Sequence, residues 1–235
     1  GVGVSAFSSG QEVFGFIPPT IGGTYAQYVA ASSDALVSKP QGLDFINAAS
    51  IPVVAMTAWQ ALFVVGGLAK GQSVLIHGGA GGVGMFAVQL AKWKGAHVTA
   101  TASAKDLEFV RGLGADVVID YKADRFEDKV SGVDVGLDLI GGETQQRSWR
   151  TMKPGGILVA TPAPPSQEEA TRHEVRAVMV HMQGDRAQLS TIAELIATGA
   201  IKTFVGATFP LADARKAQQA SESGHVRGKI VLQIA

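Results

Sequence analysis

A run of glycines between two different hydrophobic patterns is the feature that most constrains the fold of this chain. The run is Gly78-Gly79-Ala80-Gly81-Gly82-Val83-Gly84. Residues 73–77 before it are mostly aliphatic and β-branched, which is typical of a strand buried on both faces. After it, apolar residues recur at helical spacing until Gly95. The pattern therefore predicts a strand, a glycine turn and a helix.

Three of these glycines have a predicted role in the turn. Gly79 is expected to permit the tight turn, Gly81 the approach of a phosphate to bare backbone, and Gly84 close packing of the helix on the strand. A pyrophosphate would rest on the helix N-terminus, where free N–H groups and the positive end of the helix dipole attract an anion. A glycine-rich turn that binds nothing is the alternative, but the flanking elements favour a dinucleotide site.

Strand and helix patterns alternate after this turn. Repeated βα units of this length imply a parallel sheet with helices on both faces. The predicted fold class is therefore α/β, with a doubly wound Rossmann-type sheet. Strands are expected over residues 73–77, 97–102, 117–120, 133–139, 156–161 and 175–180, near Phe204 and over 229–234. Helices are expected over 82–94, 105–113, 125–130, 143–152, 185–198 and 212–221.

The first part of the chain has a different pattern. Short apolar runs over residues 13–16, 25–30 and 35–37 are separated by proline and glycine pairs, which predicts small antiparallel β structure with loops. Residues 45–62 are helical in composition, and Pro52 marks a boundary inside this segment.

Composition gives no support to several classes of function. Lys plus Arg and Asp plus Glu each number 20, so no basic field favours nucleic acid or an acidic membrane surface. No apolar run reaches the length of a membrane span and no signal pattern is visible, so a cytoplasmic protein is expected. Cysteine is absent, and none of the histidines at 77, 97, 173, 181 and 225 has metal-ligand spacing, so no metal site is predicted.

The end of the second predicted strand indicates which dinucleotide is bound. NAD-binding sheets carry Asp or Glu about twenty residues past the first glycine, whereas this chain reads Thr101-Ala102-Ser103-Ala104-Lys105 there. The hydroxyl of Ser103 and the ammonium of Lys105 could donate hydrogen bonds to a 2′-phosphate, so NADP(H) is the predicted cofactor. Ser103 with Asp106 also fits a helix N-cap, and Lys105 also fits a solvated surface charge.

Residues at the ends of the next three strands are further candidates, because strand carboxyl ends form the ligand crevice of such a sheet. Tyr121 could contact the adenine or the 2′-phosphate, and Ile140 and Thr161 could make backbone contacts with the cofactor. An exposed tyrosine and two ordinary turns are the alternatives.

Motifs over nearly the whole chain carry a resemblance: Thr57-Ala58-Trp59, residues 77–84, Gly114-Ala115-Asp116, Asp120-Tyr121-Lys122, residues 138–142, Lys153-Pro154-Gly155-Gly156 and Gly228-Lys229-Ile230-Val231-Leu232. Together they resemble the zinc-free medium-chain dehydrogenases/reductases, and within these the NADPH:quinone oxidoreductases. The resemblance implies three segments: a partial GroES-like catalytic domain (1–54), a Rossmann NADP-binding domain (55–182), and a return to the catalytic domain (183–235). It also implies that family members have several dozen more N-terminal residues.

The resemblance assigns roles to individual residues. Thr57 would lie near the nicotinamide half of the cofactor, and Lys229 near the cleft between the domains. Gly81, Gly82 and Val83 would hold the pyrophosphate, and Ser103 and Tyr121 would serve the 2′-phosphate. A hydrogen bond within a helix is the alternative role for Thr57, and a solvated charge is the alternative for Lys229. Zinc-dependent relatives carry a cysteine ligand where this chain has Pro52 and Val53, so zinc alcohol chemistry is not expected.

The predicted reaction is hydride transfer from NADPH to a quinone or another electron-poor carbonyl acceptor, in the cleft between the domains. No visible side chain is a convincing acid or base, so no catalytic residue is assigned. An enoyl-thioester or alkenal reductase and a cofactor-binding protein without turnover are the alternatives. A homodimer is expected from the resemblance, with residues 175–180 as a candidate edge strand; no nucleic-acid or membrane partner is expected.

Overall fold

The computed structural model describes residues 3–224 and 226–234. The chain divides into two compact units. One, the sheet unit, is Thr57–Met182; the other, the split unit, combines Gly1–Met56 with Gln183–Ala235. Helix α2 (Pro52–Trp59) contains one boundary between them. His225, one of the five histidines considered above, lies outside the described residues.

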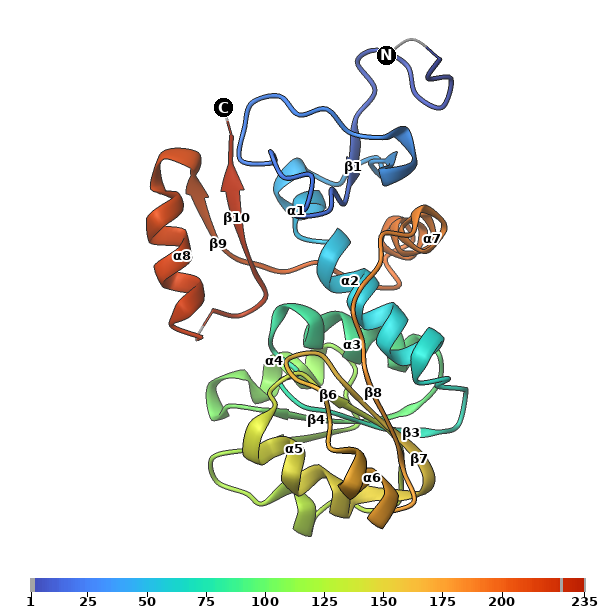
Figure 1. Cartoon of the computed structure of the whole chain (residues 1–235). Coiled ribbons are helices and arrows are strands. Elements are labelled where there is room, and N and C mark those ends of the chain that lie inside the picture. Colours follow the sequence, from blue (N-terminus) through green and yellow to red (C-terminus); the bar gives the residue numbers. More distant parts are fainter. Residues whose placement is uncertain (1–2, 225, 235) are drawn as a thin grey trace. The chain divides into compact units, whose positions relative to one another are not determined.

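The sheet unit is built on six parallel strands (Figure 1). They are β3 (Ser73–Ile76), β4 (His97–Ala102), β5 (Val117–Asp120), β6 (Val133–Asp138), β7 (Met152–Ala160) and β8 (Arg176–Met179). Their order across the sheet is β5-β4-β3-β6-β7-β8, and every neighbouring pair is parallel. This is the strand order of the Rossmann fold, so the predicted doubly wound parallel sheet is confirmed.

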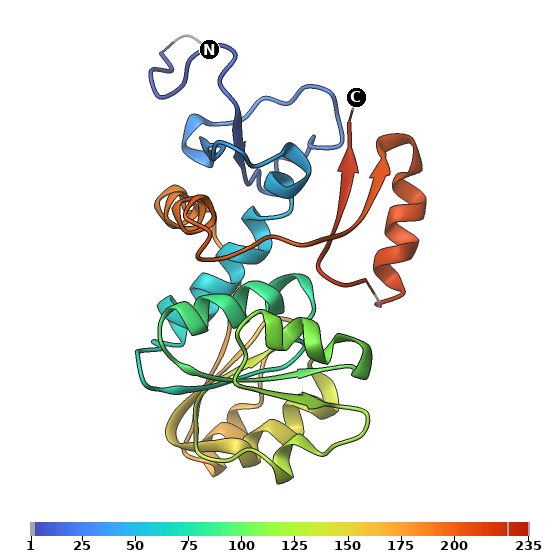
Figure 2. The same cartoon turned by 180° about the vertical axis from the view of Figure 1, so that it is seen from behind.

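Helices cover both faces of the sheet, as Figure 2 shows from behind. On one face lie α3 (Gly82–Trp93) and α4 (Leu107–Gly112), which follows the short 3-10 turn η3 (Ala104–Asp106). On the other lie α5 (Gly142–Ser148) and α6 (Gln167–Arg172). Two 3-10 turns, η4 (Phe126–Asp128) and η5 (Trp149–Thr151), complete the connections.

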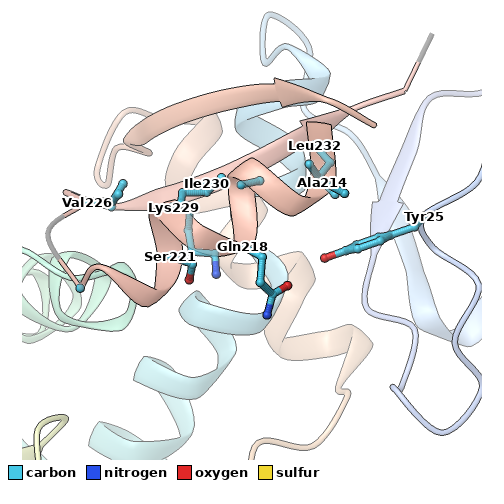
Figure 3. Close-up of a pocket in the computed structure, with 11 residues that line it drawn as sticks. Tyr25, Ala214, Gln218, Ser221, Val226, Lys229, Ile230 and Leu232 are labelled. Carbon is cyan, nitrogen blue, oxygen red and sulfur yellow. The ribbon is translucent and has the colours of Figure 1, made fainter. Parts of the chain in front are cut away.

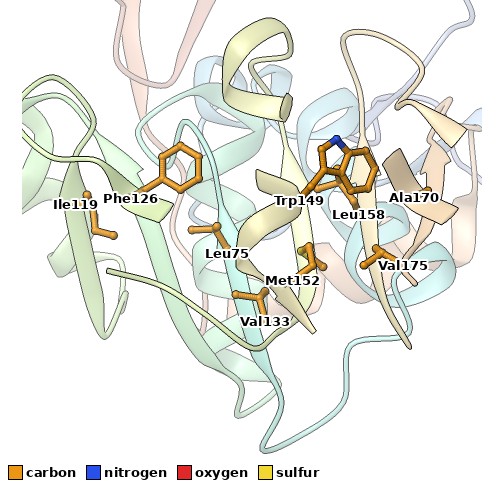
Figure 4. Close-up of a cluster of buried hydrophobic side chains, with 9 residues drawn as sticks. All are labelled: Leu75, Ile119, Phe126, Val133, Trp149, Met152, Leu158, Ala170 and Val175. Atoms are coloured by element: carbon orange, nitrogen blue, oxygen red, sulfur yellow. The ribbon is translucent and has the colours of Figure 1, made fainter. Parts of the chain in front are cut away.

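A buried apolar cluster lies on the face of the sheet that α5 and α6 cover (Figure 4). Trp149 is 1% exposed and lies among strand residues such as Leu158. Gly136 allows this packing, because a Cβ there would lie 2.7 Å from Leu158 Cδ1. The other members of the cluster are Leu75, Ile119, Phe126, Val133, Met152, Ala170 and Val175.

A group of aromatic rings joins α3 to the end of α2 and to η2 (Gln60–Val65), which continues α2 as a π-helix. Trp59 and Phe63 meet edge to face with 4.9 Å between ring centres, and Trp93 lies 6.1 Å from Trp59. Such pairs stabilise packing beyond the area that they bury.

The described part of the split unit contains two small sheets. Strands β1 (Val13–Gly15) and β2 (Leu36–Ser38) are antiparallel, as predicted, and η1 (Ser33–Ala35) precedes β2. Strands β9 (Val205–Pro210) and β10 (Lys229–Gln233) are parallel and are connected through η6 (Leu211–Asp213) and α8 (Ala214–Glu222). The remaining helices of this unit are α1 (Phe45–Ala49) and α7 (Arg186–Ala197).

Several local features differ from the predictions: β7 begins at Met152 rather than at residue 156, and the helix expected over 125–130 is only the 3-10 turn η4. Residues 25–30 do not form a strand: Tyr25 is 67% and Tyr28 91% exposed, so the run buries little apolar surface that would stabilise a strand. Helix α6 was not predicted, because Ala170 is its only buried residue. The helix is instead started by Ser166, whose hydroxyl accepts the Glu169 N–H at 3.2 Å.

No helix among the described residues is long and apolar enough to cross a membrane.

Candidate functional site

The carboxyl edge of the six-stranded sheet brings most of the predicted site residues together. Because the strands are parallel, their carboxyl ends meet at one edge, where ligands of such sheets bind. The glycine turn follows β3, and each of the next four strands of the chain is followed by candidates: Ser103 and Lys105 (β4), Tyr121 (β5), Ile140 (β6) and Thr161 (β7). Thr57 is buried in α2, and Lys229 begins β10 of the split unit.

The glycine turn needs its glycines for partly different reasons than the pattern predicted. The positive φ of +78° falls on Gly78, not on Gly79, which corrects the predicted site of the tight turn. Gly79 is required by close packing, since a Cβ there would lie 3.1 Å from Ala100 Cβ. A Cβ on Gly84 would lie only 2.1 Å from the carbonyl oxygen of Gly78, so any side chain there would push the helix off the turn.

The first amides of this turn are occupied by the protein itself. The N–H of Gly78 donates to Thr101 Oγ1 at 3.2 Å, and that of Gly79 to the Thr101 carbonyl at 2.9 Å. The N–H of Gly81 donates to the Gly78 carbonyl at 3.0 Å. The next three residues, 82–84, open α3, and the first amides of a helix have no acceptor within it. These amides can therefore bind an anion at the positive end of the helix dipole.

A carboxylate, Asp106, lies beside the end of β4, although the sequence has no acid at the strand end itself. The Ser103 hydroxyl donates to Asp106 Oδ2 at 2.8 Å, and Asp106 is 7% exposed. Ser103 occupies the N-cap position of η3, but its side chain makes no capping hydrogen bond, contrary to the predicted alternative. The 3-10 turn returns the Asp106 N–H to the Ser103 carbonyl at 2.8 Å, which folds the acid back against the strand end.

The other two candidates for a phosphate are exposed. Lys105 lies on the surface of η3, and Tyr121 is 51% exposed. The N–H of Tyr121 donates to the Ala102 carbonyl at 3.2 Å, so Tyr121 is fixed to the end of β4. The ammonium of Lys122 lies 5.9 Å from the centre of the Tyr121 ring. An anion at this corner would therefore meet cations and a phenol hydroxyl as well as the Asp106 carboxylate.

Asp138 organises the candidates that follow β6 and β7. It is fully buried, and its Oδ1 accepts the N–H groups of Ile140 and Gly141 at 2.9 and 2.8 Å. Its Oδ2 accepts Gln145 Nε2 at 3.0 Å, and its carbonyl accepts the Thr161 N–H at 3.1 Å. Because every acceptor of this acid has a donor, Asp138 shapes the turn and leaves Ile140 56% exposed beside Gly78.

No acid or base stands out at this edge. His77, directly before the turn, is 1% exposed, and burial lowers its pKa to about 4, so it is neutral at pH 7. Within residues 3–224 and 226–234, no three His, Cys, Asp or Glu side chains lie close enough to hold a metal ion. The described side chains therefore do not fit a zinc ion.

Lys229 lines a pocket of about 280 Å³ within the split unit (Figure 3). Small apolar side chains of α8 and β10, such as Ala217 and Ile230, form part of its wall. Polar side chains also line it: Tyr25 from a loop, Gln218 and Ser221 from α8, and Lys229 from β10. In Figure 3 the Lys229 ammonium extends toward Ser221.

Comparison with known proteins identifies relatives over the whole chain. The Zinc-binding dehydrogenase family model matches residues 113–232. "NAD(P)H oxidoreductase RTN4IP1, mitochondrial" from Danio rerio is 36% identical over 100% of this chain and 68% of its own length. "Quinone-oxidoreductase homolog, chloroplastic" from Spinacia oleracea is 30% identical over 99% of this chain and 75% of its own length.

Solved structures agree with these relatives. The quinone oxidoreductase from Coxiella burnetii superposes with a TM-score of 0.94 and 35% identity, covering 100% of this chain and 75% of that one. Mycobacterial Rv1454c, solved with NADPH, gives a TM-score of 0.78 and 28% identity, covering 85% of this chain and 68% of that one.

These findings also correct one expectation. A cytoplasmic location was inferred from the absence of a signal pattern, but the Danio rerio relative is named as mitochondrial and the Spinacia oleracea relative as chloroplastic. The cytoplasmic prediction is therefore wrong by comparison with its relatives, because the visible sequence carries no information about compartment. With a family match over half of the chain and relatives over all of it, the chain belongs to the Zinc-binding dehydrogenase family, the medium-chain dehydrogenases/reductases, and is an oxidoreductase with quinone oxidoreductase homologues.

Proposed function

We propose that this chain binds NADPH at the carboxyl edge of the sheet unit and reduces a quinone or another electron-poor carbonyl compound without zinc. The observation that carries the proposal is the amide group at the start of α3. Residues 82–84 present first-turn N–H groups beside a turn in which the N–H groups of Gly78, Gly79 and Gly81 are already paired, which favours a preformed anion site. The bound cofactor would supply the hydride, and the protein orients it and excludes water.

The pyrophosphate is assigned to Gly81, Gly82 and Val83. Gly81 is the N-cap, with extended backbone and no side chain to cover the helix mouth, and Gly82 begins the helix. Gly79 and Gly84 act indirectly, by letting the turn pack against β4 and the helix. The backbone at Ile140 and Thr161 borders the same edge, held by Asp138. Thr57 is proposed to lie near the nicotinamide, as the resemblance implies, and Lys229 is proposed to bind the cofactor.

The 2′-phosphate is assigned to the corner formed by Ser103, Lys105 and Tyr121. A lysine and two hydroxyls are donors that suit a phosphate. Asp106 opposes this preference, because its carboxylate occupies the Ser103 hydroxyl and would repel a dianion nearby. Preference for NADPH over NADH is therefore proposed to be moderate, and the cations at the surface of the corner are proposed to decide it.

Zinc independence rests on the residues of this chain. Cysteine is absent from the sequence, and the described residues contain no metal-binding group of His, Asp and Glu side chains. Carbonyl polarisation by zinc is thus not part of the proposed reaction. The reducible acceptor must itself be electron-poor, which is why a quinone is the proposed class of acceptor.

A homodimer is proposed through the exposed edge of the sheet unit. Strand β8 pairs with β7 on one side and ends the sheet on the other among the described residues. A second copy could add its own β8 there, which would cover the unpaired backbone groups of an edge strand.

Oxidation of NADPH and NADH with a panel of quinones and α,β-unsaturated carbonyls tests the proposal. We expect loss of NADPH absorbance with at least one quinone, and no loss of rate after dialysis against a zinc chelator. Reduction of the carbon–carbon double bond alone would assign the chain to the enone or enoyl-thioester reductases. Binding of NADPH without reduction of any acceptor would assign it a role without turnover, and binding of neither cofactor would overturn the proposal.

A further inference from the structure

The turn that is proposed to bind the pyrophosphate is held by a residue outside it. Thr101, near the end of β4, is 3% exposed and accepts from two successive amides. Its hydroxyl accepts the Gly78 N–H at 3.2 Å, and its carbonyl accepts the Gly79 N–H at 2.9 Å. One residue therefore fixes the first two N–H groups of the glycine turn.

The Thr101 hydroxyl also has a second partner that decides where its proton lies. Oγ1 is 3.3 Å from Nδ1 of His77. Oγ1 accepts from Gly78 with one lone pair, so toward Nδ1 it can either donate its proton or accept with its second lone pair.

The contact of the other ring nitrogen decides between these two arrangements. Nε2 is 2.9 Å from Ser148 Oγ, and that hydroxyl donates to the Thr144 carbonyl at 2.7 Å. Since the only proton of Ser148 is used for the carbonyl, Nε2 must be the donor in its contact with Oγ. A neutral imidazole therefore carries its proton on Nε2, and its Nδ1 accepts from the Thr101 hydroxyl.

The surroundings of His77 favour this neutral state. The ring is 1% exposed and meets the Phe126 ring edge to face, with 4.5 Å between centres. Burial is the largest influence on the ring and, together with Arg147, lowers its pKa. This outweighs Asp138 and Glu127, which favour protonation. Protonation would place an N–H opposite Thr101 Oγ1 and force the hydroxyl proton away from its acceptor.

We propose that Thr101 and neutral His77 are positioning residues that align the amides of the glycine turn for the pyrophosphate, although neither touches the ligand. The inference rests on the proposed function, because it presumes that the turn binds a dinucleotide. Without the hydroxyl, the buried Nδ1 of His77 and the partly buried N–H of Gly78 both lose their partner. The turn then relaxes, and the anion meets amides that are no longer aligned.

The test is NADPH affinity in matched variants of the whole chain. T101V keeps the shape of the side chain and removes the hydroxyl, and we expect it to raise the Kd for NADPH about tenfold or more. T101S restores the hydroxyl and is expected to stay within about twofold of the original Kd. T99V is the control, because Thr99 is 6% exposed in the same strand and takes no part in the turn, so its Kd should not change.

A second ligand separates alignment of the turn from general damage. Adenosine 2′-monophosphate lacks the pyrophosphate, so its affinity should be the same in T101V as in the unaltered chain. Equal loss for both ligands would overturn the inference, as would a T101V variant that binds NADPH normally. If the unaltered chain binds NADPH, either result removes the inference and leaves the proposed function intact, whereas failure of the unaltered chain to bind removes the proposed function itself.

If T101V does not fold, the NADPH affinity of T101S and the protonation site of the His77 ring still test the inference. Nitrogen-15 NMR of the His77 ring at pH 7 should show the proton on Nε2, and T101S should keep it there. A proton on Nδ1, or loss of NADPH affinity in T101S, would overturn the inference.

Discussion

The carboxylate of Asp106 accepts a hydrogen bond from the Ser103 hydroxyl, with 2.8 Å between the two oxygens. A serine proposed to receive a phosphate thus already serves an acid. In the proposed complex the hydroxyl would have to turn toward the ligand and leave Asp106 with one donor fewer. Substitutions in this pair are therefore expected to change the preference between NADPH and NADH.

Removal of the Asp106 charge is expected to favour NADPH. In D106N the repulsion of a 2′-phosphate disappears, so the ratio of the NADH Kd to the NADPH Kd should rise about tenfold, or about 1.4 kcal/mol. Fluorescence titration with both cofactors measures this ratio. E108Q removes an acid that is paired with Arg111 on the surface of α4 and should leave the ratio unchanged. An unchanged ratio in D106N would show that Asp106 does not face the phosphate.

A negative charge in the first turn of α3 is expected to block the cofactor without harming the fold. V83D places a carboxylate at the positive end of the helix dipole, which stabilises a helix by about 0.3–1 kcal/mol. The same charge should repel the pyrophosphate and raise the Kd for NADPH by at least about tenfold. Thermal unfolding and NADPH titration, with V83N as the uncharged control, separate the two effects. Normal NADPH binding by V83D would place the pyrophosphate elsewhere.

Stability is expected to depend on pH through His77. Burial lowers the pKa of His77 from its ordinary 6.5 to about 4 in the folded chain. Between these values the unfolded chain binds a proton that the folded chain does not, so the free energy of unfolding rises with pH across this window. The rise amounts to roughly 3 kcal/mol and is complete above the ordinary pKa of histidine.

Urea unfolding at a series of pH values measures this slope. The H77N variant should lose most of it, whereas H97N changes a histidine whose side chain is 60% exposed and should keep it. The same slope in H77N and in the unaltered chain would mean that another group titrates in this range.

The ion pair between Arg147 and Glu127 is expected to matter for stability. The Glu127 side chain is 2% exposed and accepts Arg147 Nε at 2.9 Å and Nη2 at 2.6 Å. Hydrogen bonds from Arg147 lower the pKa of Glu127 to about 2. R147M leaves this buried carboxylate short of its main partner and should cost about 3 kcal/mol in the free energy of unfolding.

The double variant E127Q/R147M tests that explanation, because removal of both charges should recover part of the loss. On the surface, the pair of Arg172 with Glu168 offers a comparison, and R172M should cost less than about 1 kcal/mol. Equal losses for R147M and R172M would contradict the role of burial.

The sequence predicted the sheet well because its strands are short, apolar and bounded by polar residues. Strands β4 and β5 have the predicted bounds, 97–102 and 117–120. Helix α6 was missed since capping and first-turn acids start it, and a search for apolar periodicity does not see them. The positive φ at Gly78 could not be distinguished from one at Gly79, because both are glycines in one turn.

The site was predictable as a location and less so as a set of contacts. Parallel strands dictate that the segments after β3 to β7 share an edge, so the candidates there could be found from their order alone. The roles of Thr101 and Asp106 depend on side chains that meet across the turn and on a 3-10 turn that reverses the chain. A Ser-x-x-Asp spacing and a polar residue in a buried strand are the only signals that the sequence offers for them.

The indole rings of Trp59 and Trp93 lie 6.1 Å apart, which is close enough for their excited states to couple. Such coupling produces a near-ultraviolet circular dichroism band that vanishes when the two chromophores separate. The third indole, Trp149, belongs to the other cluster and is shielded from quenchers. The unlabelled chain thus carries two optical reporters, and separate melting of the two layers over the sheet can be recorded from one sample.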